Sequence, residues 1–132
     1  MLIEFPFATP ELADRLTPNS FTLAPSVVRT SSRGSVALTS TDPSVHPRID
    51  INFLESRSDM DALIAATALC REMGASKAFD GIRKRELMPG TLSRNAMEEF
   101  VRNAVSTYFH PVGSCKMGGD ALSVVDARLK VY

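Results

Sequence analysis

Short apolar segments broken by prolines and glycines fill the first third of the chain, and their spacing predicts β-strands. Met1–Phe7 and Phe21–Val28 are apolar and are closed or interrupted by prolines, which suits strands at a sheet edge or bend. Ser35–Thr39 follows a turn signal, and residues 49–53 alternate apolar with polar side chains, as in a half-buried strand with one wet face. These segments favour an antiparallel sheet.

The pattern then changes to helical spacing in two places. Ser58 and Asp61 have the spacing of a capping box, apolar positions recur every three or four residues after them, and Gly74 supplies a stop. A second helix is predicted from Asn95 to Tyr108 by another apolar stripe. The first stripe contains Met60, Leu63, Ile64, Thr67, Cys70 and Met73, and the second contains Met97, Phe100, Val101, Ala104, Val105 and Tyr108.

Composition and charge exclude several classes of protein. The chain has 132 residues, 44% hydrophobic and 23% charged, which is the range of one globular domain. Lys plus Arg equals Asp plus Glu at 15 each, so bulk charge gives no reason to expect a nucleic acid as partner. No apolar run approaches the roughly 20 residues of a membrane span. The first residues lack the pattern of a signal peptide, and a cytoplasmic location is expected, with peripheral membrane association of the parent protein as the alternative.

Cysteine and histidine are too few and too scattered for a disulfide framework or a metal site. Cys70 and Cys115 are far apart in sequence and are expected to be free thiols in a reducing compartment. His46 and His110 are the only histidines, and paired ligand spacings are absent. His46 lies in a proline-flanked loop and is interpreted as a surface residue.

The densest unusual segment is Thr107–Gly119, in which His110 lies where the second predicted helix gives way to a loop. An imidazole at such an edge can exchange a proton near neutral pH, although a lone histidine beside aromatic residues is more often structural. A P-loop is rejected because no Lys and Ser/Thr follow Gly118. A Cys115–His110 nucleophile pair stays conceivable as a minor alternative. The chain contains no G-x-G-x-x-G fingerprint for a dinucleotide.

The last ten residues, 123–132, read as a strand with no polar tail after it. Either this strand is the natural end of the domain and is paired at both edges, or the natural protein continues beyond it. The residues alone leave both interpretations open.

Three blocks, in order, resemble the glucose–methanol–choline (GMC) oxidoreductase family. The blocks are Ser32–Leu38 with Asp42 and Pro43, then Pro47–Asp50 leading to Phe53 and Leu54, and then His110–Gly118, read as HPVGSCKMG. Val125–Asp126 and Leu129–Tyr132 are similar to the family's next step. The HPVGSCKMG block is the specific part of the resemblance.

The resemblance implies an α+β fold, an antiparallel or mixed sheet with helices packed on one face, formed by residues 1–132 as a single partial domain. Residues 1–30 would be leading strands and loops, and residues 31–132 would be the GMC C-terminal-like part. It also implies oxidation of a small alcohol with hydride transfer to FAD. His110 would be the catalytic acid/base, and Pro111 and Val112 would lie near the flavin ring.

The family's FAD-binding domain and its final segment, with a second active-site His or Asn, have no counterpart in these residues. FAD is therefore expected in the complete enzyme and is not expected bound to this chain alone. The missing FAD-binding domain is one expected partner, and oligomers could form through exposed edges. The alternative is a catalytically inactive fragment or a stand-alone interaction module that retains the fold. Arg33 is expected to anchor a turn or pair with a carboxylate, and Arg83–Arg85 to form a solvated face.

Overall fold

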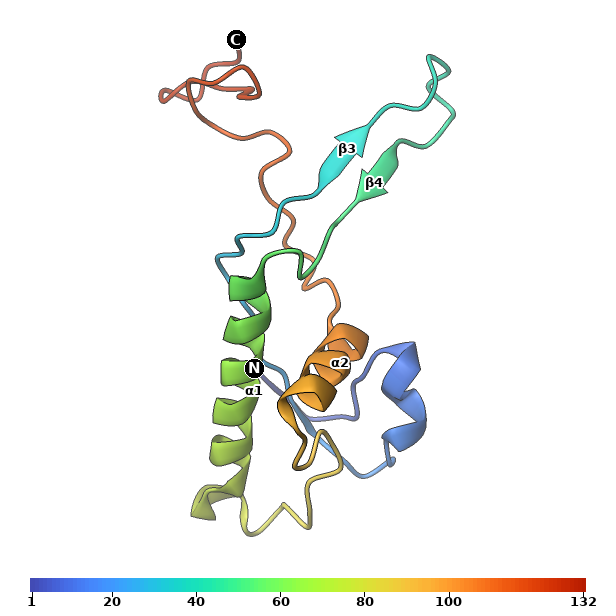
Figure 1. The fold of residues 1–132 in the computed structure, drawn as a ribbon, viewed down its shortest axis with the longest axis vertical. Helices are drawn as coiled ribbons and strands as arrows, with labels where there is room; N and C mark the ends of the chain where they lie inside the picture. Colours follow the sequence, from blue (N-terminus) through green and yellow to red (C-terminus); the bar gives the residue numbers. More distant parts are fainter. The chain divides into compact units, whose positions relative to one another are not determined.

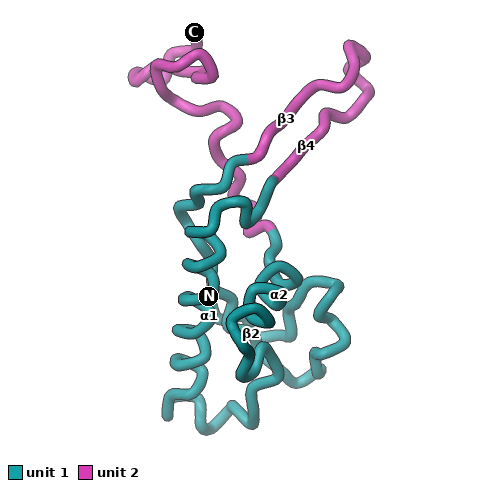
Figure 2. The backbone as a smooth tube through the Cα atoms, in the orientation of Figure 1, with its two compact units in different colours: residues 1–33, 52–106 teal, residues 34–51, 107–132 magenta.

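The computed structural model describes residues 1–132, which form two compact units (Figure 2). Unit 1 comprises residues 1–33 and 52–106, and unit 2 comprises residues 34–51 and 107–132. All four buried apolar side chains, Leu12, Leu54, Met60 and Val101, belong to unit 1. Two small antiparallel sheets accompany the helices, so the expected α+β class is confirmed. Whether residues 1–132 form a single domain stays a prediction.

Unit 1 consists of a short sheet and two packed helices (Figure 1). Strand β1 (Leu2–Ile3) pairs antiparallel with β2 (Thr22–Leu23), and the 3₁₀ helix η1 (Pro10–Arg15) lies between them in sequence. Helix α1 (Arg57–Ala75), the 3₁₀ helix η2 (Lys77–Phe79) and helix α2 (Arg94–Ala104) follow. The core forms where α1 meets α2. Leu54, Met60 and Val101 are buried there, and Leu63, Ile64, Phe100 and Val105 pack against them.

Helix α1 begins earlier than the capping-box spacing predicted. Its N-cap is Ser56, and neither Ser56 nor Ser58 caps a backbone N–H with its side chain; their hydroxyls instead bond each other at 2.8 Å. The capping-box prediction is therefore wrong. The helix also continues through Gly74 to Ala75, where Arg83 Nη1 donates to the Gly74 carbonyl oxygen. Arg83 thus provides a hydrogen-bond donor for a carbonyl oxygen at the C-terminal end of α1. The prediction that Arg83 belongs to a solvated face is therefore wrong.

Helix α2 ends four residues earlier than its apolar stripe predicted. Ser93 caps its first turn by accepting from the Ala96 N–H at 3.3 Å, and the last helical residue is Ala104. The stripe Val105 to Tyr108 includes β-branched residues, which favour extended backbone, and Val105 already has φ −70° and ψ 134°. The prediction that His110 lies at a helix end is therefore wrong, because an irregular segment separates it from α2.

Unit 2 contains a hairpin of β3 (Ser35–Ala37) and β4 (Arg48–Asp50). The strands pair antiparallel, with Val36 opposite Ile49. Gly34 is required at the base of the hairpin, because a Cβ there would lie 2.0 Å from the Asp50 carbonyl oxygen. All three β4 residues are exposed, so the predicted half-buried strand is wrong in its burial, although its alternation is present.

The second part of unit 2, residues 107–132, closes its last turns with hydrogen bonds of its own. Gly118 N–H donates to the Val125 oxygen at 3.0 Å, and Tyr132 N–H donates to the Val124 oxygen at 3.1 Å. The Tyr132 hydroxyl also donates to the Gly118 oxygen at 2.8 Å. The end of the chain is therefore folded back on residues 117–125.

Candidate functional site

The three candidate site residues, His110, Pro111 and Val112, lie consecutively in the irregular segment of unit 2 that follows α2. All three are exposed, and Val112 is 94% exposed. The His110 ring contacts the Tyr108 ring edge-on, with centroids 5.3 Å apart and planes at 66°. No hydrogen bond engages either imidazole nitrogen, so both are open to a ligand or water.

The backbone around His110 bends sharply on both sides. Phe109 has φ 61°, and its N–H donates to Thr107 Oγ1 at 3.0 Å. Gly113 has φ 100°, a conformation that strains any side chain, and a Cβ there would meet nothing within 4 Å. The motif therefore presents His110, Pro111 and Val112 on a bend whose surface is open.

The second half of the motif continues into the closed turns of residues 116–132. Lys116 Nζ forms an ion pair with Asp120 at 2.5 Å, which lowers the pKa of that carboxyl below its usual value. Val124 N–H donates to the Lys116 oxygen at 3.0 Å. Lys116 is thus used in holding the loop, and its ammonium group is paired.

Cys115 gives no support to a thiol enzyme. It is exposed, its thiol is free, and it shares no hydrogen bond with His110. A general base that activates a thiol must lie within hydrogen-bond reach of it. Cys70 is also free and is partly buried on α1.

A buried carboxylate in unit 1, which the sequence did not single out, fastens the Ser-Arg-Gly block. Asp59, 5% exposed, accepts hydrogen bonds from Ser31 N at 2.8 Å, Ser32 N at 2.8 Å and Ser32 Oγ at 2.5 Å. These hydrogen bonds lower the pKa of the Asp59 carboxyl, and the bond from the Ser31 N–H has the largest effect. Arg33 Nη1 donates to the Thr30 oxygen at 2.7 Å and to the Ser32 oxygen at 2.9 Å, and it holds irregular backbone where a turn was predicted.

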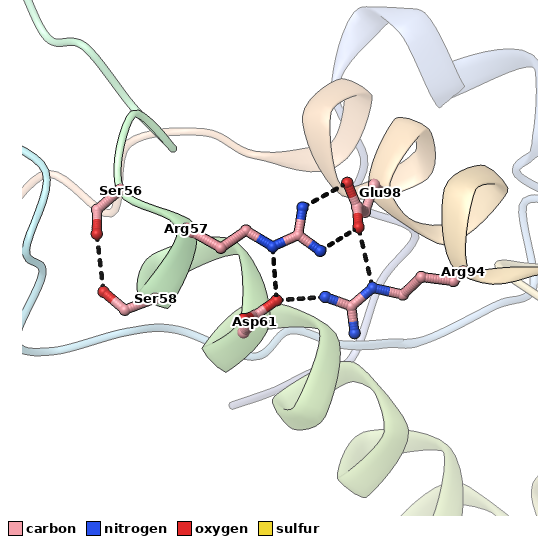
Figure 3. A network of polar contacts seen from close by, with 6 residues as sticks. All are labelled: Ser56, Arg57, Ser58, Asp61, Arg94 and Glu98. Atoms are coloured by element: carbon pink, nitrogen blue, oxygen red, sulfur yellow. Dashed lines mark hydrogen bonds and ion pairs between the residues drawn. The ribbon is translucent and has the colours of Figure 1, made fainter.

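A ring of four charged side chains joins α1 to α2 (Figure 3). Arg57 donates to both carboxylate oxygens of Glu98, at 3.0 and 2.6 Å, and its Nε lies 3.2 Å from Asp61. Arg94 pairs with the same two carboxylates. The i,i+4 pairs within each helix are readable from the sequence, but the crossing pairs depend on how the helices pack.

The remaining surface of unit 1 brings together no group of side chains suited to catalysis or metal binding. Two hollows, of about 450 and 200 Å³, open in this surface, and neither is lined by a cysteine or a histidine. The larger is lined by Leu2, Glu4, Pro18, Asn19, Ser20, Phe21 and Ile82. The smaller is lined by Leu12, Arg15, Leu92, Ala96, Glu99, Phe100 and Asn103. No three His, Cys, Asp or Glu side chains gather where a metal ion could bind. None of the helices has the length and apolar character needed to cross a bilayer.

Comparison with known proteins gives one consistent result. Residues 30–132 match the family model described as GMC oxidoreductase. The chain is 41% identical over 107 residues to the oxygen-dependent choline dehydrogenases of Klebsiella pneumoniae (strain 342) and Escherichia coli O157:H7. This match covers 80% of the chain and 19% of each relative.

A solved structure agrees with the sequence matches. The crystal structure of pyridoxine 4-oxidase from Mesorbium loti is similar with a TM-score of 0.73 and 36% identity, over 77% of this chain and 20% of that one. The chain therefore spans about a fifth of the length of the proteins it resembles.

Proposed function

The chain belongs to the GMC oxidoreductase family, and from this premise we propose that it forms the substrate-side, acid/base part of an FAD-dependent enzyme that oxidises alcohols. One observation carries the proposal: an imidazole with two unengaged nitrogens lies in the open bend of the HPVGSCKMG segment, inside the matched region. The names of the matched proteins support the substrate class, because choline and pyridoxine are both alcohols.

In this proposal, His110 accepts the hydroxyl proton of the alcohol. Oxidation of a CH–OH group removes a hydride from carbon and a proton from oxygen, and a positioned base accelerates such a step by about 10²–10⁴-fold. A neutral imidazole nitrogen takes the proton, and the resulting cation stabilises alkoxide character at the oxygen. The edge-on contact with Tyr108 restricts the ring, which helps to aim it.

The residues of this chain fit contact with the flavin ring, but they do not fit binding of the rest of FAD. Pro111 and Val112 expose apolar side chains beside His110, and nothing lies within 4 Å of the position that a Cβ on Gly113 would take. No glycine-rich strand–turn–helix is present to hold the pyrophosphate. Bound FAD would accept the hydride, and Pro111 and Val112 would contact its ring.

The test of the proposal is a His110→Ala substitution in the holoenzyme encoded by the complete reading frame that contains this sequence. Loss of the base lowers the rate of flavin reduction by alcohol by about 10²-fold or more, while bound flavin stays constant. His46→Ala is the control, because His46 is the other histidine and is exposed in the hairpin connection. Stopped-flow absorbance measures the rate, and an undiminished rate in His110→Ala would reject the assignment.

The 132-residue chain by itself tests whether the cofactor site lies outside these residues. Purified alone it is expected to bind no flavin, because it carries no dinucleotide fingerprint. Stoichiometric FAD in that preparation would contradict the proposed division of the cofactor site. A reading frame that encodes no flavin domain would favour the interaction module.

A cytoplasmic location is part of the proposal. Both cysteines are free thiols, which suits a reducing compartment. Fractionation of cells that produce the protein would test it, and recovery only from membranes or from outside the cell would contradict it.

A further inference from the structure

The rings of Tyr108 and His110 contact each other across a single intervening residue. Their centroids lie 5.3 Å apart and their planes meet at 66°, which is the edge-on arrangement that aromatic pairs prefer. Tyr108 is 50% exposed, and His110 is exposed as well. Unit 2 has no buried apolar side chain, so no surrounding core holds either ring in place.

The backbone between the two rings has an unusual conformation. Phe109 has φ 61°, a left-handed value that is uncommon for residues other than glycine and costs free energy when the side chain is bulky. Burial of Phe109 does not offset this cost, because the residue is 79% exposed. The Phe109 N–H donates to Thr107 Oγ1 at 3.0 Å, and a threonine hydroxyl that accepts from the N–H two residues on stabilises a turn. The Thr107 hydroxyl therefore supports the bend at Phe109.

The contact with Tyr108 restricts the imidazole without occupying either of its nitrogens. A histidine is commonly oriented by a hydrogen bond at one ring nitrogen, which leaves only the other nitrogen for a substrate. His110 makes no such bond, and the edge-on ring contact limits rotation of the imidazole through packing alone. The imidazole is therefore oriented while both nitrogens stay open.

We propose that Thr107 and Tyr108 are positioning residues for His110. The Thr107 hydroxyl fixes the left-handed bend at Phe109, and the bend brings the rings of Tyr108 and His110 together. The ring contact then holds the imidazole in the orientation that accepts the alcohol proton. The inference rests on the proposed function for the use of this orientation, whereas the contact itself is local to four consecutive residues of the chain.

The first test concerns the ring contact and needs no flavin. The chain has two histidines and two tyrosines, so nuclear Overhauser contacts between selectively labelled His and Tyr rings are readily assigned in the 132-residue chain. The contact between Tyr108 and His110 is expected in the wild type and in Thr107→Ser, which keeps the accepting oxygen. It is expected to be lost in Thr107→Val, which keeps the branched shape without an acceptor. Ser106→Ala, at the exposed neighbouring position, is the control.

The second test is the rate of flavin reduction in the holoenzyme encoded by the complete reading frame. At saturating alcohol, Tyr108→Ala and Thr107→Val each slow the rate by about tenfold or more, because small misplacements of a reacting group lower rates steeply. Bound flavin stays constant in both variants. Tyr108→Phe and Thr107→Ser keep the ring and the acceptor, so each reduces flavin within about twofold of the wild-type rate. Ser106→Ala leaves the rate unchanged.

A double-mutant cycle separates positioning from a merely structural role. Residues that act through one shared group have non-additive effects. In the His110→Ala background, Tyr108→Ala is therefore expected to cause no further slowing. A general loosening of the loop would slow reduction by the same factor in both backgrounds.

Equal slowing by Tyr108→Ala in both backgrounds would overturn the proposal, and so would wild-type rates in Tyr108→Ala and Thr107→Val when His110→Ala is slow. A ring contact that persists in Thr107→Val would overturn the role of Thr107. Slow reduction in Tyr108→Phe would overturn the role of the ring, because the effect would then belong to the hydroxyl. An undiminished rate in His110→Ala would reject the proposed function together with this inference, and that result differs from failure of the inference alone.

Discussion

Glu98 is the carboxylate on which the ring of charges between the helices depends. Its hydrogen bonds with Arg57 and then Arg94 lower its pKa from 4.5 to about 2, and its side chain is 19% exposed. Because the folded pKa lies below the unfolded one, this group stabilises the fold above about pH 4.5 and loses that contribution as the pH falls toward 2.

Glu98→Gln is therefore expected to flatten the acid side of the stability curve. The wild-type free energy of unfolding falls between about pH 5 and 2, and the variant loses less over this window because it starts without the charge. Urea unfolding at a series of pH values measures the difference. Glu99→Gln is the control, since Glu99 is a neighbouring exposed residue on α2 without an ion pair. Parallel curves for wild type and Glu98→Gln would contradict the role of the ring.

A second prediction for a single residue concerns the hydrogen bonds of Asp59. Asp59→Asn keeps the shape of the side chain but sets an N–H₂ group against donors from Ser31 and Ser32. Hydrogen bonds to a buried charged group contribute about 1.5–3 kcal/mol, so the variant is expected to lose about 2 kcal/mol. Chemical denaturation measures this loss, and Glu72→Gln on the exposed side of α1 should change stability by less than about 0.5 kcal/mol. Equal effects of the two substitutions would show that the Asp59 contacts contribute nothing specific.

Among the elements, the β3–β4 hairpin is the most sensitive to a single methyl group. In Gly34→Ala the new Cβ would meet the backbone oxygens of Asp50 at 2.0 Å and Ile51 at 2.8 Å, and backbone cannot move aside as a flexible side chain can. We expect the strand pairing to be lost while α1 and α2 remain. Cross-strand nuclear Overhauser contacts between Val36 and Ile49 measure the pairing. Gly81→Ala, with nothing within 4 Å of its Cβ, is the matched control.

The helices and strands could be predicted from the sequence better than their ends and their burial could. Apolar spacing located both helices, because α1 and α2 pack through that stripe. It could not locate the first residue of α1, since Ser56 and Ser58 are equally good caps by composition and neither hydroxyl caps the backbone. Alternation identified the apolar face of β4, but it contains no information on whether another segment covers that face.

In the candidate site, too, the sequence predicted some features correctly and missed others. His110 and its motif were recognisable, and the open bend around them agrees with a surface position. The helix end assigned to His110 was wrong, because Val105 leaves helical geometry before the apolar stripe ends. The contacts of Asp59 were not predicted, because they join residues 27 and 28 positions apart through loop backbone.

For the whole molecule, buried apolar side chains are confined to unit 1. Stability is therefore expected to differ between regions, with local opening easiest where few apolar contacts form. Amide hydrogen exchange should be slower in the middle of α1 than in β3 and β4, by on the order of 10²-fold or more. Nuclear magnetic resonance of the 132-residue chain measures it, and uniform protection across both units would contradict the expectation.

Helix α1 is fastened at both ends, to Ser31 and Ser32 through Asp59 and to Arg83 through the Gly74 carbonyl. Removing one residue between these points would turn one end by about 100° relative to the other and shorten the helix by about 1.5 Å. Both attachments could not then form together. Substitutions at exposed positions of α1 outside the ring of charges should therefore be tolerated better than changes in the length of the helix. Insertions and deletions among related sequences should collect in the exposed connection 40–46 of the hairpin.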